Sequence, residues 1–389
     1  MSKNANGEGS VYKRMRDGKM VRYEGAIIFI GDDGKPKRHT VYGRTRQDVR
    51  GKLSAARDRL NAGAPVKDAT RTVGDWLKHW RATTLAASDR KESTRVLYGG
   101  LSRKHLEPAP FGAVRLDRLK ASDVEGLVLA MRAKTKADGK RALSDSTIRQ
   151  VYTVLRAGLD GAVRDGLLAR NPAALVKRPG VERTEAKHLP SADLSAVLKA
   201  AEGSRYYPTL LLIAATGLRK GEALALRWDR VDLDAGTVKV LATISRVDGH
   251  LVVSEPKTDR SRRTVPIPPA MAVMLRKHRT EQKVERLQAG NQWVDSGLVF
   301  TNEFGGPVEP RNLLRVVEAA AKKVGVEGVG VHTLRHSAAV SWLEAGVHIK
   351  AVADLLGHSS IAVTGDVYGH TSDDTARAAV EGHLGRLGL

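Results

Sequence analysis

One tyrosine and five cationic or hydrogen-bonding side chains are the residues of this sequence that could do chemistry together. The set contains no pair of acids, and the chain has no cysteine, so neither two-carboxylate nor thiolate chemistry fits. It suits the stabilisation of a pentacovalent phosphate while a tyrosine oxygen attacks it. The sequence therefore predicts an enzyme that transfers DNA strands. The six residues are Arg219, Lys257, His332, Arg335, His358 and Tyr368.

A tyrosine that attacks a phosphodiester needs help, because the phenol pKa is ordinarily about 10. A neighbouring base must take the phenolic proton, and His332 is the candidate. Planar guanidinium groups bind phosphate oxygens bidentately, which makes Arg219 and Arg335 the candidate pair for the developing charge. His358, in a short turn, could donate to the same phosphate. Lys257, in a basic turn after a strand, could contact the DNA backbone or protonate the leaving 5′ oxygen.

Two further side chains are candidates for supporting roles. Glu222 stands three residues after Arg219 and could orient it through an ion pair, or it could be an ordinary acid on a helix surface. His332, Arg335 and His336 can share one helix face. The spacing of the two histidines also occurs in zinc sites, but the intervening Thr-Leu-Arg lacks the glutamate of a metalloprotease and puts a cation beside the metal. We expect no metal, and a supporting or packing role for His336.

Composition narrows the class of partner. A chain of 389 residues with a net charge of +22 predicts two or three domains and a polyanionic partner, most often nucleic acid. No apolar run is long enough to cross a membrane and no basic-then-apolar leader opens the chain, so we expect no membrane partner. The absence of cysteine excludes disulfides and fits a reducing cytoplasm.

The residue pattern predicts a multidomain α+β protein with three segments. Residues 1–65 are basic and hold three β-like runs followed by a helix, which predicts a small sheet-plus-helix domain. Residues 72–179 form helical patterns only. Residues 188–389 mix helices with strands, and residues 177–190 between them resemble a linker. The three β-like runs are 10–14, 21–30 and 38–42, and the helix is 45–61.

The pattern also places individual elements. In the second segment Val73, Trp76, Leu77 and Trp80 form an amphipathic stripe, and a second helix covers residues 144–165. In the third segment a strand at 238–244, the Asp248-Gly249 turn and a strand at 250–253 predict a hairpin, with 264–267 as its third strand. The helices expected in the third segment are 191–201, 269–287, 310–324, 333–345 and 349–356.

Four blocks in the third segment resemble the tyrosine recombinases of the phage-integrase type. They occur in the family's order, and the last one precedes Tyr368. The blocks are Thr-Gly-Leu-Arg-Lys-Gly-Glu at 216–222 with Leu-Arg-Trp at 226–228; Pro-Lys-Thr at 256–258 through Arg-Thr-Val-Pro at 263–266; His-Thr-Leu-Arg-His at 332–336; and Leu-Leu-Gly-His-Ser-Ser at 355–360.

The resemblance implies a role for each site residue. Tyr368 would form a 3′-phosphotyrosyl link and release a 5′ hydroxyl. Arg219, Arg335 and His358 would hold the phosphate, His332 would handle the tyrosine proton, and Lys257 would act as the acid. Because the covalent link conserves the bond energy, neither ATP nor a metal cofactor is implied.

The resemblance also implies domains and partners. Residues 188–389 would be the catalytic domain, 72–179 a core-binding domain, and 1–65 an arm-type DNA-binding domain. The partner would be double-stranded DNA with core and arm attachment sites, bound by a homotetramer that integrates or excises a phage or mobile element. Accessory bending or excision factors are further candidate partners, and the expected location is the cytoplasm of a bacterial host, in association with the nucleoid. The candidate DNA contacts are Lys13, Arg14, Lys37, Arg38, Arg260 and Arg262.

Two other functions compete with recombination. A type IB topoisomerase would use the same cleavage without exchanging partners, but separate core and arm domains argue against it. A DNA-binding regulator could use residues 349–368 as a helix-turn-helix and the charge for affinity. That interpretation leaves the blocks around Arg219, Lys257 and Arg335 unexplained.

Overall fold

The computed structural model describes residues 10–16, 19–30, 36–61, 71–182, 187–255, 262–358 and 360–368. The chain divides into two compact units, Met1–Glu182 and Arg183–Leu389, each of which is described by itself. Within these described ranges no helix is long and apolar enough to span a membrane. The boundaries of the three segments stay a prediction.

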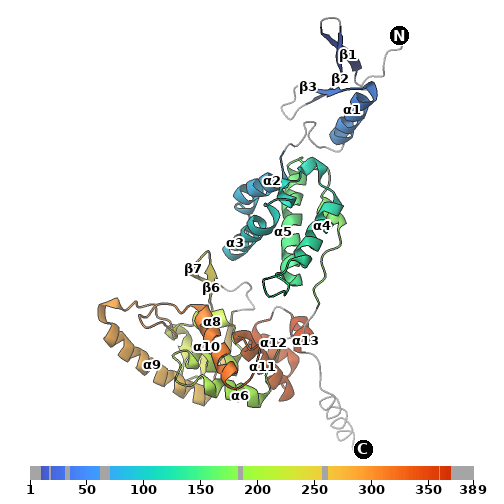
Figure 1. Cartoon of the computed structure of the whole chain (residues 1–389). Helices are drawn as coiled ribbons and strands as arrows, with labels where there is room; N and C mark the ends of the chain where they lie inside the picture. Colours follow the sequence, from blue (N-terminus) through green and yellow to red (C-terminus); the bar gives the residue numbers. More distant parts are fainter. Residues whose placement is uncertain are drawn as a thin grey trace, which may run out of the picture. The chain divides into compact units, whose positions relative to one another are not determined.

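The first unit begins with a three-stranded antiparallel sheet in the order β1-β2-β3, formed by β1 (Ser10–Arg16), β2 (Lys19–Ile30) and β3 (Pro36–Gly43). Helix α1 (Arg46–Asn61) covers one face of this sheet (Figure 1). Ile27 of β2 and three residues of α1, Val49, Leu53 and Ala56, make the small apolar core between them. The predicted sheet-plus-helix fold is confirmed.

The rest of the first unit is helical. Val73, Trp76, Leu77 and Trp80, the predicted stripe, are all buried. The Trp76 indole donates from Nε1 to Gly158 O at 2.8 Å, which ties two helices together. The Ser144 side chain accepts from Thr147 N and so starts the long helix where the sequence places it. The helices are α2 (Val73–Trp80), α3 (Glu92–Leu101), α4 (Ala121–Ala133) and α5 (Asp145–Arg164), with π-helical turns at Arg81–Leu85 and Ser102–Leu106.

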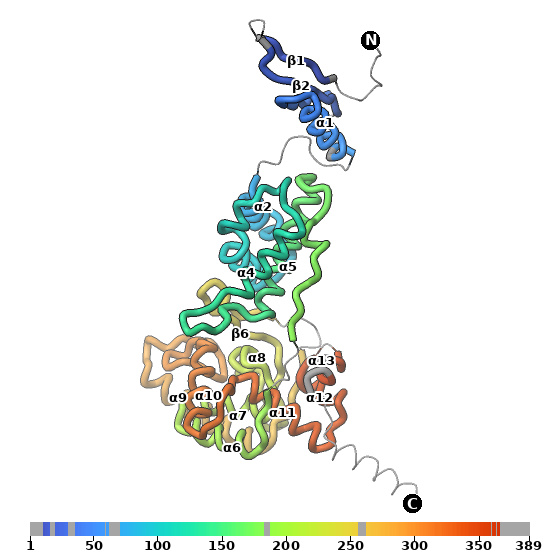
Figure 2. The backbone as a smooth tube through the Cα atoms, turned by 45° about the vertical axis from the view of Figure 1, so that its right-hand side comes forward, coloured from blue at the N-terminus to red at the C-terminus, as the bar shows by residue number. Residues whose placement is uncertain are grey.

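The second unit combines helices with small sheets around one large apolar core. A smaller apolar cluster joins α11 to α12 through Ala339, Val352 and Leu356, and both views show these helices side by side (Figures 1 and 2). The helices are α6 (Ser191–Ala200), α7 (Tyr207–Thr216), α8 (Lys220–Leu224), α9 (Pro269–Ala289), α10 (Pro310–Lys323), α11 (Val331–Glu344), α12 (Ile349–Leu356) and α13 (Ile361–Tyr368).

The strands of the second unit differ from the prediction in one respect. The run expected at 238–244 is two strands, β5 (Thr237–Val240) and β6 (Thr243–Val247), which belong to different sheets. β6 pairs with β7 (His250–Ser254) through the predicted Asp248-Gly249 turn. The expected third strand, β8 (Arg263–Pro266), pairs with β5 in the sheet that also holds β4 (Val231–Asp232).

Burial explains why β8 pairs with β5 and does not extend the hairpin of β6 and β7. Val238 of β5 and Val265 of β8 are register partners, and both are buried in the large core. On β7, by contrast, Val253 is 60% exposed. Pairing β8 with β5 removes more apolar surface from water than extending the exposed hairpin would. The local pattern of residues 238–267 does not contain this preference.

Candidate active site

Arg219 lies at the N-terminus of α8, directly after the turn that ends α7. That turn needs glycine, because Gly217 has a φ of 62° in the left-handed region. Glu222, in the first turn of α8, accepts from Arg219 N at 2.9 Å and from Arg219 Nη1 at 2.8 Å. The predicted ion pair is present, and its carboxylate is buried, with a side chain only 4% exposed.

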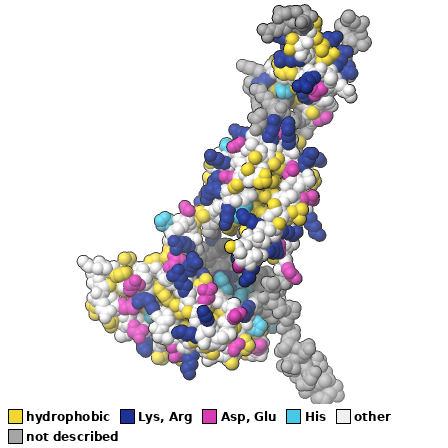
Figure 3. Space-filling model, in the orientation of Figure 1, with side chains coloured by type: hydrophobic (Ala, Val, Ile, Leu, Met, Phe, Trp, Pro, Cys, Tyr) yellow, Lys and Arg dark blue, Asp and Glu magenta, His cyan; other side chains and the backbone are white. Residues whose placement is uncertain are grey.

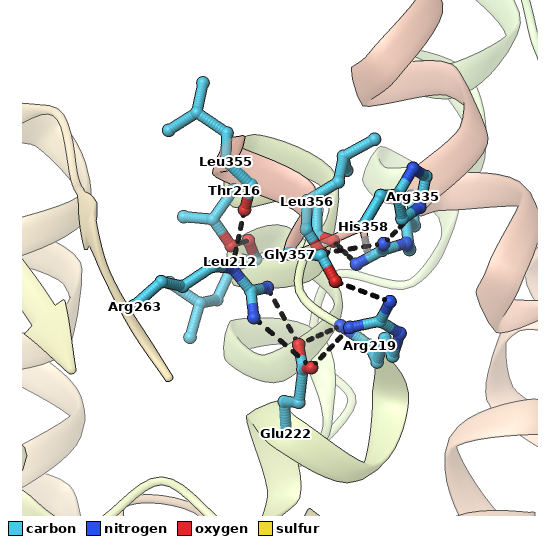
Figure 4. Close-up of polar contacts among 11 residues, drawn as sticks. Leu212, Thr216, Arg219, Glu222, Arg263, Arg335, Leu355, Leu356, Gly357 and His358 are labelled. Atoms are coloured by element: carbon cyan, nitrogen blue, oxygen red, sulfur yellow. Dashed lines mark hydrogen bonds and ion pairs between the residues drawn. The ribbon is translucent and has the colours of Figure 1, made fainter. Parts of the chain in front are cut away.

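Arg335 lies on α11 and is 3% exposed. Its Nη1 donates to Gly217 O at 2.6 Å, and its Nη2 donates to Leu356 O at 2.9 Å and lies 2.9 Å from His358 Nε2. Arg335 therefore joins three segments that are far apart in sequence: the turn before Arg219, the end of α12 and the histidine that follows it (Figure 4).

His358 follows the C-terminal glycine of α12. A guanidinium group has only donors, so the contact with Arg335 makes Nε2 of His358 the acceptor. The ring proton then lies on Nδ1, which is 2.8 Å from Thr364 Oγ1 in α13. Burial, followed by the positive charges of Arg335, Arg219 and Arg263, lowers the pKa of His358 to about 4. The ring is therefore neutral near pH 7.

Arg263, on β8, is a second arginine bound to Glu222. Its Nη2 donates to Glu222 Oε2 at 2.9 Å and its Nε donates to Leu355 O at 2.6 Å. Burial acts to raise the pKa of Glu222, but Arg263 and then Arg219 outweigh it and lower that pKa. Glu222 is therefore an ionised carboxylate between two guanidinium groups, as Figure 4 shows.

His332 and His336 occupy α11 beside Arg335. His332 is exposed to solvent, and partial desolvation with the charges of Lys220, Arg335 and Arg219 lowers its pKa. Burial first, then His332, Arg335 and His188, lower the pKa of His336 to about 4. Both rings are therefore neutral near pH 7. Among the residues that the structure describes, no group of three or more His, Cys, Asp or Glu side chains could hold a metal ion.

Three predicted site residues lie wholly or partly outside the described part of the chain. Tyr368 is the last residue of α13, and its side chain lies outside the described part of the chain. Lys257 and Arg260 lie outside the described residues altogether. Arg262 is exposed and donates from Nη2 to Glu255 Oε2 at 2.7 Å. The structure thus brings Arg219, Arg335 and His358 together with Glu222, and places the chain of Tyr368 in the next helix.

The four predicted contacts in the N-terminal sheet fall on two faces. Arg14 pairs with Arg22 in the register, and Arg38 pairs with Ile28, on the face opposite α1. Arg38 donates from Nη2 to Tyr12 Oη at 2.9 Å on that open face. Lys13 and Lys37 alternate onto the face that carries α1. The strand register therefore places the four candidate DNA contacts on two different faces of the sheet. It also places Arg22, which was not among the candidates, on the open face.

The sequence prediction missed two residues that contact the site. Arg263 belongs to one of the family-like blocks, but its partner Glu222 is 41 residues away in the chain. Thr364 is fully buried and contacts the ring of His358. No local signal in the sequence indicates either the contact of Arg263 with Glu222 or the contact of Thr364 with His358.

The comparisons with known proteins agree with this geometry. The phage integrase family matches residues 187–375. A tyrosine recombinase XerC-like protein of Caldanaerobacter subterraneus subsp. tengcongensis is 30% identical over 390 residues, covering 94% of this chain and 96% of that protein. The chain belongs to the phage integrase family of tyrosine recombinases. An integrase of Saccharopolyspora erythraea is 29% identical, with 93% of each chain covered.

Solved structures of tyrosine recombinases share the fold. The Tn1549 transposon integrase in complex with a circular intermediate DNA matches with a TM-score of 0.66 and 23% identity, over 80% of this chain and 99% of that one. A lambda integrase tetramer bound to a Holliday junction matches with a TM-score of 0.58 and 18% identity, over 95% and 99% of the two chains. This tyrosine recombinase is an integrase of a phage or mobile element, and it breaks and rejoins DNA at specific sites.

Proposed function

We propose that this integrase cleaves double-stranded DNA through a 3′-phosphotyrosyl intermediate formed by Tyr368. The phenol oxygen attacks the phosphorus, the bond from phosphorus to the 5′ oxygen breaks, and His332 accepts the phenolic proton. Lys257 gives a proton to the leaving 5′ oxygen. Rejoining is the reverse reaction with a 5′ hydroxyl of the partner strand, so bond energy is conserved and neither nucleotide nor metal is needed.

The convergence of three candidate phosphate ligands carries this proposal. Arg219, Arg335 and His358 meet at the C-terminal turn of α12, and α13 with Tyr368 begins three residues after His358. Two guanidinium groups offset the charge on the non-bridging oxygens as the pentacovalent phosphate forms. Removal of one pre-organised donor of this kind typically costs about 2.7–4 kcal/mol of transition-state stabilisation.

The neutral state of the histidines supports the proposed proton transfers. His332 has a lowered pKa, so near pH 7 its ring is free to accept the phenolic proton. His358 carries its proton on Nδ1 while Nε2 accepts from Arg335. When Arg335 turns to the phosphate, the Thr364 hydroxyl can donate to Nδ1 instead, and Nε2 can then carry the proton toward a phosphate oxygen.

The N-terminal sheet would bind arm-type sites and the helical segment, with the catalytic unit, core sites. Arg14, Arg22 and Arg38 on the open face of the sheet would contact DNA there, and Lys13 and Lys37 would reach the backbone from the sheet edge. Arg260 and Arg262 would contact the backbone near the crossover. The active assembly would be a homotetramer on two DNA sites, the state seen for lambda integrase on a Holliday junction.

Covalent trapping tests the proposed chemistry without knowledge of the attachment site. The full chain is incubated, without metal or nucleotide, with a pool of nicked duplexes that carry a randomised segment. SDS-resistant protein–DNA adducts are isolated, and their DNA is amplified and sequenced. We expect enrichment of one family of sequences, and peptide mapping should place the adduct on Tyr368.

The Tyr368→Phe variant is the control, since it removes one oxygen and leaves the DNA-binding residues intact. It should bind the enriched duplex as the wild type does and form no adduct. An adduct that survives in Tyr368→Phe would contradict the proposal. Exchange between two labelled duplexes, rather than relaxation of a supercoiled plasmid alone, then separates recombination from topoisomerase activity.

A further inference from the structure

Three arginines donate to three consecutive backbone carbonyls at the C-terminal end of α12. Arg263 Nε donates to Leu355 O at 2.6 Å, and Arg335 Nη2 donates to Leu356 O at 2.9 Å. Arg219 Nη2 donates to Gly357 O at 3.1 Å. Figure 4 shows the three guanidinium groups around this turn. Two of these arginines are candidate phosphate ligands; Arg263 has no assigned role.

The carbonyl groups explain how like charges can gather before DNA is bound. Arg219 and Arg263 both bind the single carboxylate of Glu222, and Arg335 adds a third positive charge to the same turn, so positive charge is in surplus among these four residues. The last carbonyls of a helix have no partners within the helix and carry the negative end of its dipole. These carbonyl oxygens therefore accept hydrogen bonds from arginine N–H groups that would otherwise be free to bind a phosphate. On DNA, Arg219 and Arg335 can exchange these carbonyls for phosphate oxygens.

Arg263 differs from the other two arginines in how strongly it is bound within the protein interior. Its side chain is 7% exposed, against 36% for Arg219, and both of its terminal nitrogens contact the Glu222 carboxylate. The contacts of Arg335 described above are to neutral groups, which a phosphate can replace at lower cost. A phosphate that displaced Glu222 from Arg263 would leave a buried carboxylate without its main partner.

We propose that Arg263 is a positioning residue of this integrase: it holds Glu222 and the turn at 355–357 in place, so that Arg219 and His358 stand ready for the scissile phosphate. This inference rests on the proposed phosphotyrosyl chemistry. Glu222 transmits the effect to Arg219 through its bonds to the backbone nitrogen and to Nη1. The bond from Arg263 to Leu355 O transmits it to His358, and Arg263 Nη1 also lies 2.9 Å from the position that a Cβ of Gly357 would take.

The same unit offers a matched control arginine. Arg205 also binds a carboxylate with both terminal nitrogens, at 2.7 and 2.6 Å from Glu285, and its Nε donates to Thr301 O at 3.2 Å. It contacts none of the site residues in these bonds. Changes at Arg205 therefore reproduce the loss of an Arg–Glu pair and of a carbonyl contact without touching the turn at 355–357.

The experiment measures single-turnover adduct formation by the full chain on the enriched nicked duplex. Arg263→Lys and Arg263→Ala are compared with Arg205→Lys and Arg205→Ala. The rate at saturating protein should fall at least about tenfold for both Arg263 variants, while the protein concentration at half-saturation stays unchanged. Free guanidinium ion at low concentration should restore part of the rate to Arg263→Ala, because it can occupy the vacated site. It should not accelerate either Arg205 variant.

Several results would overturn the assignment. Wild-type rates in the Arg263 variants would do so, as would losses in both arginine sets that simply follow the unfolded fraction measured by thermal denaturation. If Arg263→Ala does not fold, Arg263→Lys still shows whether the rate at saturating protein falls while the protein concentration at half-saturation stays unchanged. Unfolding of both variants would assign Arg263 to the fold alone. Failure of the wild type to form an adduct, or an adduct with Tyr368→Phe, would instead reject the proposed chemistry.

Discussion

Three arginine residues form most of this site, and they differ in how deeply they are buried and in which groups they bind. Arg219 is partly exposed and shares Glu222 with the buried Arg263, whereas Arg335 is buried and donates to the carbonyls of Gly217 and Leu356. A phosphate needs donors that are pre-organised yet can change partner. The backbone carbonyls of the α12 turn meet that need, because they hold the guanidinium groups without neutralising them.

Replacement of the two candidate phosphate ligands should separate catalysis from stability. Arg219→Ala and Arg335→Ala should both slow adduct formation by about 10²–10³. Only Arg335→Ala should also lower the free energy of unfolding markedly, because it leaves the carbonyls of Gly217 and Leu356 buried without these donors, at about 1–3 kcal/mol for each. Urea unfolding monitored by circular dichroism measures the difference. Equal destabilisation by the two variants would contradict the burial argument.

The free energy of unfolding should fall as the pH is lowered through the range in which two half-buried histidines stay neutral in the folded chain but are protonated in the unfolded chain. His336 and His358 have pKa values of about 4, whereas histidine in an unfolded chain titrates near about 6.5. Between these values the unfolded state binds more protons, so the free energy of unfolding decreases as the pH falls from about 6.5 toward 4 and is fully retained above that range.

Urea midpoints measured at several pH values in this window test the titration argument. Solvent screening at these half-buried rings limits the effect to the order of 1 kcal/mol for each histidine. The His336→Asn and His358→Asn variants should each show a shallower pH dependence than the wild type. An unchanged dependence in both variants would place the titrating groups elsewhere.

At the scale of elements, the site is built where helices end. Gly217 directly follows α7, α8 begins after Arg219, and Gly357 directly follows α12, immediately before His358. Helix ends supply backbone groups without partners in the helix, and glycine allows the chain to turn sharply after the last residue. The two glycines therefore set the positions of the neighbouring catalytic candidates.

The turn after α12 should tolerate no side chain at its glycine. Gly357 has a φ of 66°, and a Cβ there would lie 2.9 Å from Arg263 Nη1. Gly346, which follows α11, has a φ of 79° with nothing within 4 Å of such a Cβ. Both Gly→Ala variants add backbone strain of about 1–2 kcal/mol, but only Gly357→Ala should also push Arg263 aside. We expect a larger drop in melting temperature and slower adduct formation for Gly357→Ala alone.

At the scale of the whole molecule, most of the charge of +22 belongs to the first compact unit, Met1–Glu182, whose 38 Lys and Arg against 20 Asp and Glu give +18, while Arg183–Leu389 has 27 against 23, or +4. Figure 3 shows Lys and Arg side chains over the N-terminal sheet, the helical region and the catalytic unit. Each unit has an apolar core of its own. This distribution suits a protein that contacts a long stretch of DNA backbone.

Binding of the enriched duplex should therefore depend steeply on salt. An interface with roughly 6–10 phosphate contacts loses about 10³–10⁵ in affinity between about 50 and 200 mM salt. For duplexes that include the arm sequence, Arg14→Gln and Arg38→Gln should each reduce the slope of log K against log salt by about 1. Arg276→Gln, which removes an exposed pair with Asp234, is the control and should leave the slope unchanged. Fluorescence anisotropy measures both quantities.

The local sequence determined most of the elements and the types of the site residues. Apolar spacing and capping residues act over a few positions, so α2, α5 and the N-terminal strands agree closely with their patterns. The four blocks before Tyr368 likewise indicated a phosphoryl-transfer site and the family. The boundaries of the DNA-binding segments and the roles of the individual site residues stay predictions.

Tertiary structure decided what long-range burial controls. β8 pairs with β5 because Val238 and Val265 are buried together, a choice that no residue near either strand reveals. The same pairing brings Arg263 to Glu222, and the packing of α13 beside α12 brings Thr364 to His358. Such contacts join residues through a shared core rather than through sequence spacing. For that reason only the folded chain shows which arginine anchors the site.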